Sequence, residues 1–463
     1  MAEQIMQNAA GKTIPAGYQQ TEVGVIPEDW STPTINEITN NIIDYRGRTP
    51  KKLGMEWGGG NILALSAGNV KKGFIDYRAE CYFGSDELYR KWMTSGHAQK
   101  DDIVFTMEAP LGNAALIPDE KRYILSQRTV LLQIAKSKIN PKFIIQYFLS
   151  DLFQKYISDC ATGSTAQGIK RATFEQMFVA VPLRLEEQTA IANVLSDSDA
   201  LIDALEQLIA KKQAIKSATM QQLLTGRTRL PAFALRPDGT PKGYKPSELG
   251  DIPEDWEVKS VYALANNQKA LFDDGDWIEA EHITDKGVRL IQTGNIGIGS
   301  FIEKDVKKYV YEKSFESLRC KELHIGDLLI CRLAEPAGRA CILPYIGEAK
   351  VITSVDVTIF RPERNIANRD FLVQYFSSTE WFKSVQEQVG GTTHKRISRG
   401  ALGQLLMPYP SLDEQTAIAT ILSDMDNELQ ALTQKLEKAH ALKQGMMQQL
   451  LTGKIRLPLA AGA

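Results

Sequence analysis

LEEQTAIANVLSD, at residues 185–197, is written again as LDEQTAIATILSD at residues 412–424, and each copy runs into a segment that ends in QQLLTG. A second matching pair lies upstream of these, GYQQTEVGVIPEDW at residues 17–30 and GYKPSELGDIPEDW at residues 243–256. The matches keep one order at a nearly constant offset, so the chain contains an internal repeat. Its period is far longer than the roughly 20 to 50 residues of a solenoid repeat. We therefore expect each half to be a globular domain with an appended helix.

Between the repeated segments the two halves diverge. Residues 31–181 and 257–408 agree only at scattered positions, which indicates one scaffold that carries two variable surfaces. Short apolar runs bounded by turn residues, such as NILALSAGNV at residues 61–70, predict strands. KFIIQYFLSDLFQKYI at residues 142–157 and RDFLVQYFSSTEWFKSV at residues 369–385 each predict a helix. The predicted class of each domain is mixed α+β.

Two long helices are predicted from the apolar periodicity of the repeated tails. Apolar residues in 415–451 recur at intervals of four and three, which is the period of a coiled-coil seam, and the first half repeats the pattern more loosely. The expected seam positions are Ile418, Leu422, Met425, Leu429, Leu432, Leu436, Ala439, Met446 and Leu450, with Ile191, Leu195, Ile202, Leu205, Ile209 and Ile215 in the first half. Gly226 and Gly453 supply the C-terminal stops.

Charge is distributed asymmetrically along both helices. Acidic residues fill the first part of each and lysines the later part. Antiparallel pairing sets each acidic part against the lysines of the other helix, whereas parallel pairing sets like charges together. We therefore predict an α+β fold in which two mixed α/β domains are joined by two long antiparallel coiled-coil helices, with a pseudo-two-fold internal repeat.

The domain boundaries are expected to follow the repeat. In chain order they are an N-terminal segment that completes a circular repeat (1–25), the first domain (26–184), a central helical spacer (185–231), a linker (232–251), the second domain (252–411), a C-terminal helical spacer (412–458) and a tail (459–463).

Composition excludes several classes of protein. The 463 residues include 54 Lys and Arg against 56 Asp and Glu, so the net charge of −2 gives no global attraction to nucleic acid or anionic lipid. Any DNA binding must come from local basic patches. Five cysteines without a Cys-x-x-Cys spacing argue against a disulfide scaffold or zinc ribbon and favour buried thiols. Neither a secretion signal nor a membrane span is recognisable, so we expect a cytoplasmic protein with no membrane partner.

The motifs for catalysis are incomplete. Gly11-Lys12-Thr13 lacks the first glycine of a phosphate-binding loop, and the histidines fall into no metal spacing. Asn140-Pro141-Lys142-Phe143 is similar to the Asn/Asp-Pro-Pro-aromatic loop of amino-methyltransferases but lacks its second proline. Asp273, Asp274, Asp276, Glu279 and Glu281 form an acidic cluster with no counterpart in the first half. We expect no catalytic residue and no metal site.

Basic loops carry the better functional signal. Residues 44–52 combine four cations with an aromatic and turn residues, and residues 163–171 correspond to 391–399 in the second half. Hydroxyls and backbone N–H groups beside Lys and Arg suit phosphate contacts, although a solvated loop is the alternative for either one alone. The Gly-Asn pairs at 68–69 and 294–295 are either structural turns or DNA-facing loops. The candidate DNA-binding residues are Tyr45, Arg46, Arg48, Lys51, Asn69, Ser164, Thr165, Gln167, Lys170, Arg171, Asn295, Thr392, Thr393, His394, Lys395, Arg396 and Arg399.

The chain resembles the specificity subunit of a type I restriction-modification system. The resemblance is carried by the doubled IPEDW, the doubled Gly-Asn-Val/Ile, the Gly-Ser/Thr-Thr loops and the doubled EQTAIA segment before a helix ending QQLLTG, and it covers essentially the whole chain. It implies that the two variable domains are target-recognition domains, each binding one half of a bipartite sequence in double-stranded DNA. It also implies that the helices set the unread gap and dock two methyltransferase (modification) subunits.

The same resemblance places catalysis in other chains. Methyltransferase subunits carry S-adenosylmethionine and methylate adenine, and motor-nuclease (restriction) subunits join for cleavage with ATP and magnesium. We expect none of these cofactors in this chain, and no enzymatic activity. Two alternatives remain open: a self-contained DNA methyltransferase or nuclease, and a DNA-independent scaffold with two protein-binding heads.

Overall fold

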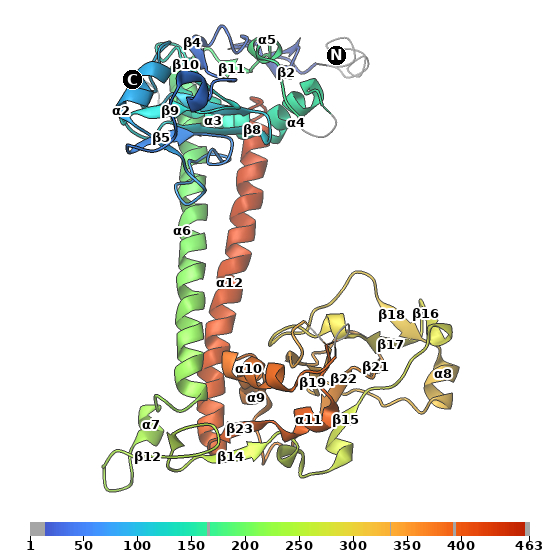
Figure 1. Ribbon diagram of the computed structural model, residues 1–463. Helices are drawn as coiled ribbons and strands as arrows, with labels where there is room; N and C mark the ends of the chain where they lie inside the picture. The colour runs from blue at the N-terminus through green and yellow to red at the C-terminus, as the bar shows by residue number, and fades with distance from the viewer. Residues whose placement is uncertain (1–13, 164–166, 334, 392–394, 459–463) are drawn as a thin grey trace. The chain divides into compact units, whose positions relative to one another are not determined.

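The computed structural model describes residues 14–163, 167–333, 335–391 and 395–458, and the chain divides into two compact units. The first unit comprises residues 1–206 and 435–463, and the second comprises residues 207–434. Each unit contains one variable domain, the beginning of one long helix and the end of the other (Figure 1). Both units are therefore built from segments of both halves of the chain.

The first domain is built on two sheets. A four-stranded antiparallel sheet has the order β4-β10-β7-β8, and a three-stranded sheet has the order β6-β5-β9, with β5 parallel to β9. Two short pairs, β1 with β2 and β3 with β11, accompany them. The strands are β1 (Tyr18–Thr21), β2 (Gly24–Pro27), β3 (Trp30–Ser31), β4 (Thr39–Asp44), β5 (Ile62–Leu65), β6 (Phe83–Gly84), β7 (Ile103–Met107), β8 (Leu111–Leu116), β9 (Tyr123–Leu125), β10 (Thr129–Ile134) and β11 (Val181–Pro182).

Four short helices and a 3-10 turn complete this domain. They are the 3-10 turn η1 (Pro50–Leu53), α2 (Asp86–Trp92), α3 (Pro141–Leu149), α4 (Asp151–Cys160) and α5 (Arg171–Glu175). The prediction of one helix over 142–157 is wrong, because the chain breaks at Ser150. Ser150 is extended (φ −69°, ψ 147°), and its hydroxyl accepts a hydrogen bond from the Phe153 N–H, which begins α4. The strand predicted over 61–70 is also too long, since β5 ends at Leu65 before a turn.

The second domain repeats this plan. Its antiparallel sheet has the order β15-β22-β19-β20, and its mixed sheet has the order β16-β18-β17-β21, with β17 parallel to β21. The strands are β12 (Tyr244–Lys245), β13 (Ile252–Pro253), β14 (Glu257–Ser260), β15 (Phe272–Asp274), β16 (Ile283–Thr284), β17 (Val288–Ile291), β18 (Lys308–Val310), β19 (Leu328–Cys331), β20 (Ala340–Ile342), β21 (Val351–Thr353), β22 (Val357–Phe360) and β23 (Leu406–Tyr409).

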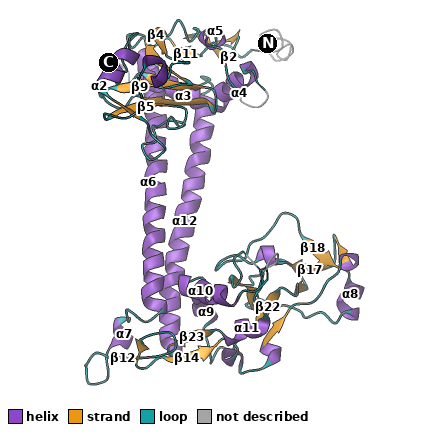
Figure 2. Ribbon diagram, viewed as in Figure 1, coloured by secondary structure: helices purple, strands orange, loops and turns teal. Residues whose placement is uncertain are grey.

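The helices of the second domain follow the same order as those of the first. They are α7 (Pro231–Ala234), α8 (Glu312–Ser317), α9 (Arg369–Tyr375), α10 (Thr379–Gln388) and α11 (Arg399–Gln404), with the 3-10 turns η2 (Ala263–Ala265), η3 (Lys269–Leu271), η4 (Ala280–His282) and η5 (Thr293–Asn295). The predicted helix over 369–385 is again divided, here at Ser378, whose hydroxyl caps α10. Figure 2 shows the mixture of helices and strands in each domain, which confirms the predicted α+β class and the internal repeat.

The two long helices are α6 (Leu185–Leu224) and α12 (Leu412–Leu450). In the first unit, Lys443 near the end of α12 pairs with Asp199 near the beginning of α6. In the second unit, the Lys212 ammonium of α6 lies 2.7 Å from the Glu428 carboxylate of α12. Each helix therefore sets its acidic beginning against the basic end of the other, which confirms the antiparallel prediction. In the described residues, no helix has an apolar stretch long enough to span a membrane.

One predicted seam position on α6 is wrong. Ile215 is 42% exposed, whereas Ile202 and Leu205 are buried as expected. The intervals of four and three continue from Ile209 through Lys212 and Lys216, both of which are only partly exposed. A lysine stem packs against apolar neighbours while its ammonium reaches outward, and here Lys216 pairs with Asp426. The apolar pattern missed these positions because it counts lysine as polar.

An arginine clamp joins the second domain to the helices. Arg229, just after α6, donates to Glu414 at 2.7 and 2.8 Å and to Asp255 at 2.7 and 3.1 Å. Glu414 is 2% exposed and also accepts a hydrogen bond of 2.9 Å from the Trp256 indole N–H. The second IPEDW segment and the second EQTAIA segment are thus held together by one guanidinium.

The first unit contains the same clamp. Arg456 donates to Glu187 at 2.5 and 2.7 Å and to Asp29 at 2.8 Å. Close to each clamp, a tyrosine hydroxyl binds the carbonyl of the glycine that ends a long helix, Tyr18 to Gly453 and Tyr244 to Gly226. The repeated sequence segments are therefore the joints between helices and domains, which explains why they differ less than the domains themselves.

Candidate nucleic-acid interface

The loop that follows β4 presents cations on a rigid frame. The Asp44 carboxylate accepts hydrogen bonds from the Arg46 backbone N–H at 2.9 Å and from its guanidinium at 2.7 and 3.0 Å. The Arg48 guanidinium lies over the Tyr45 ring, 4.8 Å from its centroid, and also donates to the Trp92 carbonyl. Thr49 caps the turn η1, on which Lys51 is exposed. These contacts fix the backbone of the loop and leave its lysine in solvent.

Tyr45 does not belong to the exposed part of this loop. Its side chain is 3% exposed, and its hydroxyl accepts a hydrogen bond of 2.5 Å from the Ser95 N–H. Tyr45 was predicted to contact DNA because it lies in a loop that combines four cations with an aromatic and turn residues. In this structure the ring instead supports Arg48 from the interior.

The loop before α5 lies against the edge of the main sheet. Gly168 pairs with Thr162 and with Glu108, and the Ile169 N–H donates to the Met107 carbonyl at 3.0 Å. Gln167 and Lys170 are exposed on either side of this anchored segment, and Lys170 is the residue before the first turn of α5. The predicted contacts Ser164 and Thr165 lie outside the described residues.

Arg171 follows the loop before α5 and is paired with a carboxylate of that helix. Its guanidinium donates to Glu175 at 2.6 Å. Burial raises the pKa of Asp44, but hydrogen bonds from Arg46 and the charges of Arg46 and Arg171 hold that pKa below its ordinary value. Arg171 therefore has Glu175 as its ion-pair partner, and Asp44 is held in its charged form mainly by Arg46.

The second domain builds the equivalent loop in the same way. Arg396 pairs through its backbone with Gly390 and Leu333, and the Ile397 N–H donates to the Arg332 carbonyl at 3.0 Å. Lys395 and Arg396 are exposed, although the Arg396 guanidinium also lies 3.2 Å from Asp356. Arg399 pairs with Asp273. The predicted contacts Thr392, Thr393 and His394 lie outside the described residues.

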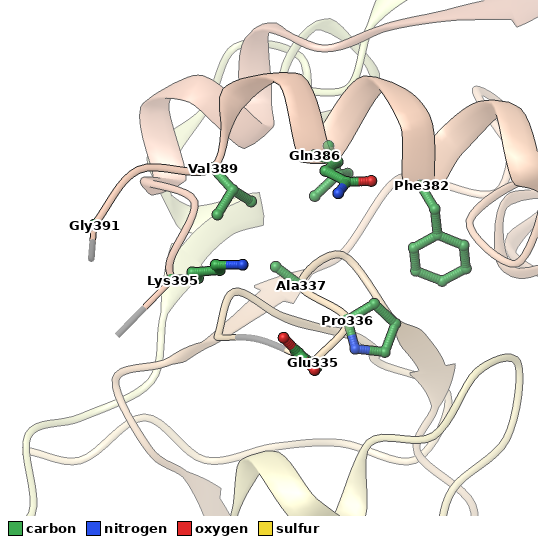
Figure 3. A pocket seen from close by; sticks show the side chains of 9 residues that line it. Glu335, Pro336, Ala337, Phe382, Gln386, Val389, Gly391 and Lys395 are labelled. Carbon is green, nitrogen blue, oxygen red and sulfur yellow. The ribbon is translucent and has the colours of Figure 1, made fainter. Parts of the chain in front are cut away.

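A pocket of about 500 Å³ lies beside this loop. Figure 3 shows Pro336, Ala337 and Phe382 on its walls, with the amine of Lys395 and the carboxylate of Glu335 directed into it. The pocket combines apolar walls with one cation and one anion, so it has no net preference for a charged ligand. It places Lys395 at the boundary between the loop and helix α10.

The two predicted asparagines are structural. Asn69 is fully buried, accepts from the Ser66 N–H at 2.8 Å and donates to the Ala64 carbonyl at 2.8 Å. Asn295 is 3% exposed and likewise accepts from the N–H three residues earlier, that of Gln292 at 3.0 Å, but it donates to the later carbonyl of Ile302 at 2.9 Å. Both side chains close a turn at the carboxyl end of a strand. Of the two interpretations offered by the sequence, this geometry favours the structural turn.

Three members of the acidic cluster of the second domain are paired with cations, while Glu279 and Glu281 are exposed. Lys321 lies 3.5 Å from Asp273 and 3.4 Å from Asp276, and the Arg332 guanidinium lies 3.0 Å from Asp274. Among the described residues, no three His, Cys, Asp or Glu side chains are placed to hold a metal ion. Asn140 of the methyltransferase-like tetrapeptide caps α3 by accepting from the Lys142 N–H at 2.9 Å. These groups are occupied in structural contacts.

The cysteines are all free thiols, and three of the five are buried. Burial raises the pKa of Cys320 to about 11 and that of Cys341 to about 12, so these thiols remain protonated at neutral pH. Cys81 and Cys160 are partly exposed. The prediction of no disulfide scaffold is confirmed, and that of burial holds for the three thiols of the second domain.

Two features of the interface were missed from the sequence. Arg128, at the start of β10, has φ +70° and extends toward Glu108 at 3.5 Å, beside the Gly168 loop. Gln127 donates to the Arg48 carbonyl at 3.1 Å and so joins the strand end to the first basic loop. The sequence feature that could have indicated Arg128 is an arginine directly before an apolar run. Nothing in the sequence places Gln127 beside Arg48.

Comparison with known proteins identifies the family of this fold. The family model described as type I restriction modification DNA specificity domain matches residues 27–216 and again residues 241–440. The MjaVIII specificity subunit of Methanocaldococcus jannaschii, a type I restriction enzyme subunit, is 26% identical over 440 residues, which cover 93% of this chain and 94% of that protein. The EcoBI specificity subunit of Escherichia coli is 23% identical over 383 residues, or 78% of this chain and 74% of that one.

A solved structure supports the same fold. The crystal structure of the type I restriction-modification S subunit from M. genitalium matches with a TM-score of 0.56 at 15% identity, covering 95% of this chain and 98% of that one. The two matched regions of the family model each contain one variable domain and most of one long helix. The chain therefore belongs to the family of type I restriction-modification DNA specificity subunits, with one specificity domain in each half.

Proposed function

We propose that this chain selects the DNA target of a type I restriction-modification complex, with each domain binding one half of a bipartite sequence in double-stranded DNA. The observation that carries the proposal is the recurrence of one anchored loop in both domains, held by Gly168 and Arg396 at equivalent sheet edges and bearing the exposed cations Lys170 and Lys395. Backbone phosphates bind exposed cations of this kind, and each neutralised phosphate makes the affinity more dependent on salt.

The candidate DNA contacts fall into three groups, according to the exposure of each side chain and its other contacts in the structure. Lys51, Gln167, Lys170 and Lys395 are exposed and are assigned to DNA. Arg46, Arg171 and Arg399 are paired with carboxylates, so their first role is to hold the loops in place. Tyr45, Asn69 and Asn295 support the interface from the interior. Base identity is then determined by side chains around these anchors, because phosphate contacts carry no sequence information.

The long helices are proposed to set the gap between the two half-sites. Helix α6 has 40 residues. At about 1.5 Å per residue this corresponds to roughly 60 Å of continuous helix. Each helix is followed by an arginine clamp on a domain. A change of helix length is therefore expected to be transmitted to the domain.

Docking of partner subunits is proposed along the same helices. Specificity subunits of type I systems are non-catalytic, and catalysis lies in methyltransferase and restriction subunits. Ile215 of α6 and Leu442 of α12 occupy equivalent positions of the repeat and are 42% and 61% exposed. Two equivalent apolar side chains suit two copies of one partner. We therefore assign two methyltransferase subunits to each chain, in the cytoplasm with the DNA that they modify.

The experiment compares the purified chain with the assembled complex. The chain alone is expected to transfer no methyl group from S-adenosylmethionine to DNA, to hydrolyse no ATP and to cleave no DNA. Addition of its methyltransferase subunits is expected to give methylation of adenine at a bipartite target. Methyl transfer by the chain alone would favour the alternative of a self-contained enzyme. A complex that assembles but binds duplex DNA without salt dependence would favour the DNA-independent scaffold.

A further inference from the structure

A second pocket opens in the first domain, between the basic loop and two parallel strands. Its volume is about 560 Å³, within the range of about 300 to 1,000 Å³ that small-molecule sites occupy. The lining residues that matter here are Arg48, Lys51, Trp57, Tyr82, Ser126 and Gln127. All of them lie in the first unit and among the described residues.

The pocket lies where open sheets bind ligands. Ser66 directly follows β5 and Ser126 directly follows β9, and both serines line it. Because β5 and β9 are parallel, their carboxyl ends meet at one edge of the sheet. Ligands of open α/β sheets bind outside the carboxyl ends of such strands. The parallel pair of this sheet gives the pocket the same position relative to its two strands.

One wall of the pocket is aromatic. The Trp57 ring centroid lies 5.8 Å from that of Tyr82 and 5.5 Å from that of Trp92. Trp92 is fully buried, and its indole N–H donates to the Leu125 carbonyl at 2.8 Å, so it fixes the base of this wall. Tyr82 remains 44% exposed. Exposed aromatic faces of this kind stack on unpaired nucleobases of any sequence.

The opposite rim carries two cations, Arg48 and Lys51, beside one carboxylate, Glu56, so its net charge is positive. Arg48 is held by the Tyr45 ring and the Trp92 carbonyl, so its guanidinium is fixed beside the aromatic wall. Lys51 is exposed on the turn η1. Gln127 joins the two sides by donating to the Arg48 carbonyl at 3.1 Å. A ligand with a planar group to stack on Trp57 and a phosphate to bind Arg48 and Lys51 contacts both walls of the pocket.

We infer that this pocket binds one unstacked nucleotide, with its base against Trp57 and Tyr82 and its phosphate against Arg48 and Lys51. The inference rests on the proposed function, because the basic loop that forms the rim is the one assigned to the DNA backbone. Continuity with that surface identifies the nucleotide as one extruded from the target duplex. A free mononucleotide offers the same chemistry and is separated from it by the test.

The second domain closes the corresponding place with its own backbone. Asp276 pairs with Ser354 at the carboxyl end of β21, its N–H donates to the Thr353 carbonyl at 2.9 Å, and its carboxylate accepts from the Lys321 N–H at 2.7 Å. The residue before it, Gly275, lies so close to Thr353 and Ser354 that a Cβ there would meet their carbonyl oxygens. The inference therefore predicts that this chain itself holds an unstacked base in one half-site and not in the other, in addition to the base that each methyltransferase subunit extrudes.

The test uses the full chain assembled with its methyltransferase subunits and duplexes that carry its target. Each base pair of each half-site is replaced in turn by a mismatch, which lowers the cost of extruding a base. One mismatch in the half-site of the first domain is expected to tighten binding by the wild type but not by Trp57→Ala, which separates this base from the one that a methyltransferase subunit extrudes. Trp57→Ala and Tyr82→Ala are each expected to weaken binding of that duplex by about 5- to 150-fold, the range of one lost base–aromatic stack.

Two further variants serve as controls. Trp57→Phe keeps an aromatic face and is expected to retain most of the affinity. Trp277→Ala removes a tryptophan of the second domain that is 68% exposed, and is expected to leave binding of the mismatched duplex unchanged. Because the Tyr82 side chain is partly exposed, Tyr82→Ala is expected to keep the fold. Unchanged binding through the second half-site shows that the complex is intact. The inference is overturned if no mismatch tightens binding, if every mismatch tightens binding equally in the wild type and in Trp57→Ala, or if both alanine variants bind every duplex like the wild type.

A second measurement separates the sources of the nucleotide. The full chain without DNA is titrated with dAMP, dGMP, dCMP and TMP, and tryptophan fluorescence is recorded. Quenching in the wild type but not in Trp57→Ala, with no mismatch effect on DNA, would assign the pocket to free nucleotides and overturn the DNA source. Loss of methyltransferase binding in Trp57→Ala, with DNA affinity intact, would assign it to a protein partner. Failure of the proposed function has a different signature, since Lys170→Ala and Lys395→Ala would then leave DNA affinity unchanged.

Discussion

At the residue scale, the exposed lysines of the two anchored loops give the most direct prediction. Lys170→Ala and Lys395→Ala are each expected to weaken DNA binding by the assembled complex and to reduce the slope of log affinity against log salt by about one unit, the effect of one lost phosphate contact. Lys138→Ala is the matched control, because this exposed lysine lies beyond the opposite end of β10. A slope that is the same in all three variants and the wild type would show that the loops do not contact phosphate.

Asp255 of the clamp gives a pH-dependent prediction. Burial raises its pKa, but hydrogen bonds from Arg229 and Lys242 and the charge of Arg229 lower it from 3.8 to about 2. The folded chain therefore binds fewer protons here than the unfolded chain between about pH 4 and pH 2. The stability that Asp255 contributes is complete above about pH 4 and is lost as the pH falls toward 2.

This prediction is measured as a difference between two proteins. The free energy of unfolding of the wild type minus that of Asp255→Asn is expected to be constant from pH 7 to pH 5 and to shrink below pH 4, by urea denaturation at each pH. The subtraction removes the other carboxylates that titrate in the same range. A difference that does not change down to pH 2.5 would show that the clamp does not hold this carboxylate in its charged form.

Individual residues also show where sequence reasoning ends. The exposure of the lysines was predictable, because charged side chains in a loop rich in Gly and hydroxyls are usually solvated. Tyr45 and Asn69 were not, since the sequence gives the type of side chain but not the direction in which it points. The two clamp arginines could have been recognised as a pair, because Arg-Leu-Pro occurs after both helices at residues 229–231 and 456–458. Their carboxylate partners could not, because these lie up to 427 positions away in the chain.

At the scale of elements, the equivalent apolar positions on the long helices predict how partners assemble. Replacement of both Ile215 and Leu442 by Glu is expected to abolish binding of methyltransferase subunits, and either change alone is expected to leave one subunit bound. Native mass spectrometry of the complex counts the subunits. The control places glutamate at Ala214 and Ala441, which are exposed and lie about 100° around each helix from the first pair. If the Ile215 and Leu442 double variant still assembled with two methyltransferase subunits, the docking surface would lie elsewhere.

The length of the helices makes a separate prediction. One heptad inserted after Glu206 in α6 and one after Gln434 in α12 keeps the seam in register and adds about 10.5 Å at 1.5 Å per residue. Duplex DNA rises about 3.4 Å per base pair, so the unread gap is expected to lengthen by about three base pairs. Sequencing of methylated adenines in cells measures the gap.

The control for this insertion places the same heptad after Asp238, in an exposed turn outside both helices. There the gap is expected to stay as in the wild type. Both half-sites are expected to be unchanged in either protein. A changed half-site at constant spacing would contradict the proposed role of the helices.

The elements themselves were largely predictable from the sequence. The long helices and their direction followed from apolar spacing and charge, because both properties are periodic over many residues. The breaks at Ser150 and Ser378 were missed because each interrupts an apolar pattern by a single extended residue whose side chain caps the next helix. Ile215 was misplaced because Lys212 and Lys216 fill seam positions with their aliphatic stems.

At the scale of the whole molecule, each unit contains the end of a long helix that begins in the other unit. The first domain is clamped by Arg456 and the second by Arg229, each at the end of a long helix. The variable part of each domain begins and ends on one pair of adjacent strands, β3 with β11 and β14 with β23. The scaffold and the two recognition surfaces are thus separable, and the domains are expected to be exchangeable at these strands.

The methylated sequence in cells that make a domain exchange, together with the partner methyltransferase subunits, tests this account most directly. In the exchanged protein, residues 257–408 of the second domain also replace residues 31–181 of the first, while both clamps and both long helices are kept. The account predicts that the wild type methylates two different half-sites at a fixed gap. It predicts that the exchanged protein methylates the half-site of the second domain twice, in inverted orientation, at the same gap. An unchanged target, or a new target with no part in common with the original one, would contradict the claim that each domain binds one half of the DNA sequence.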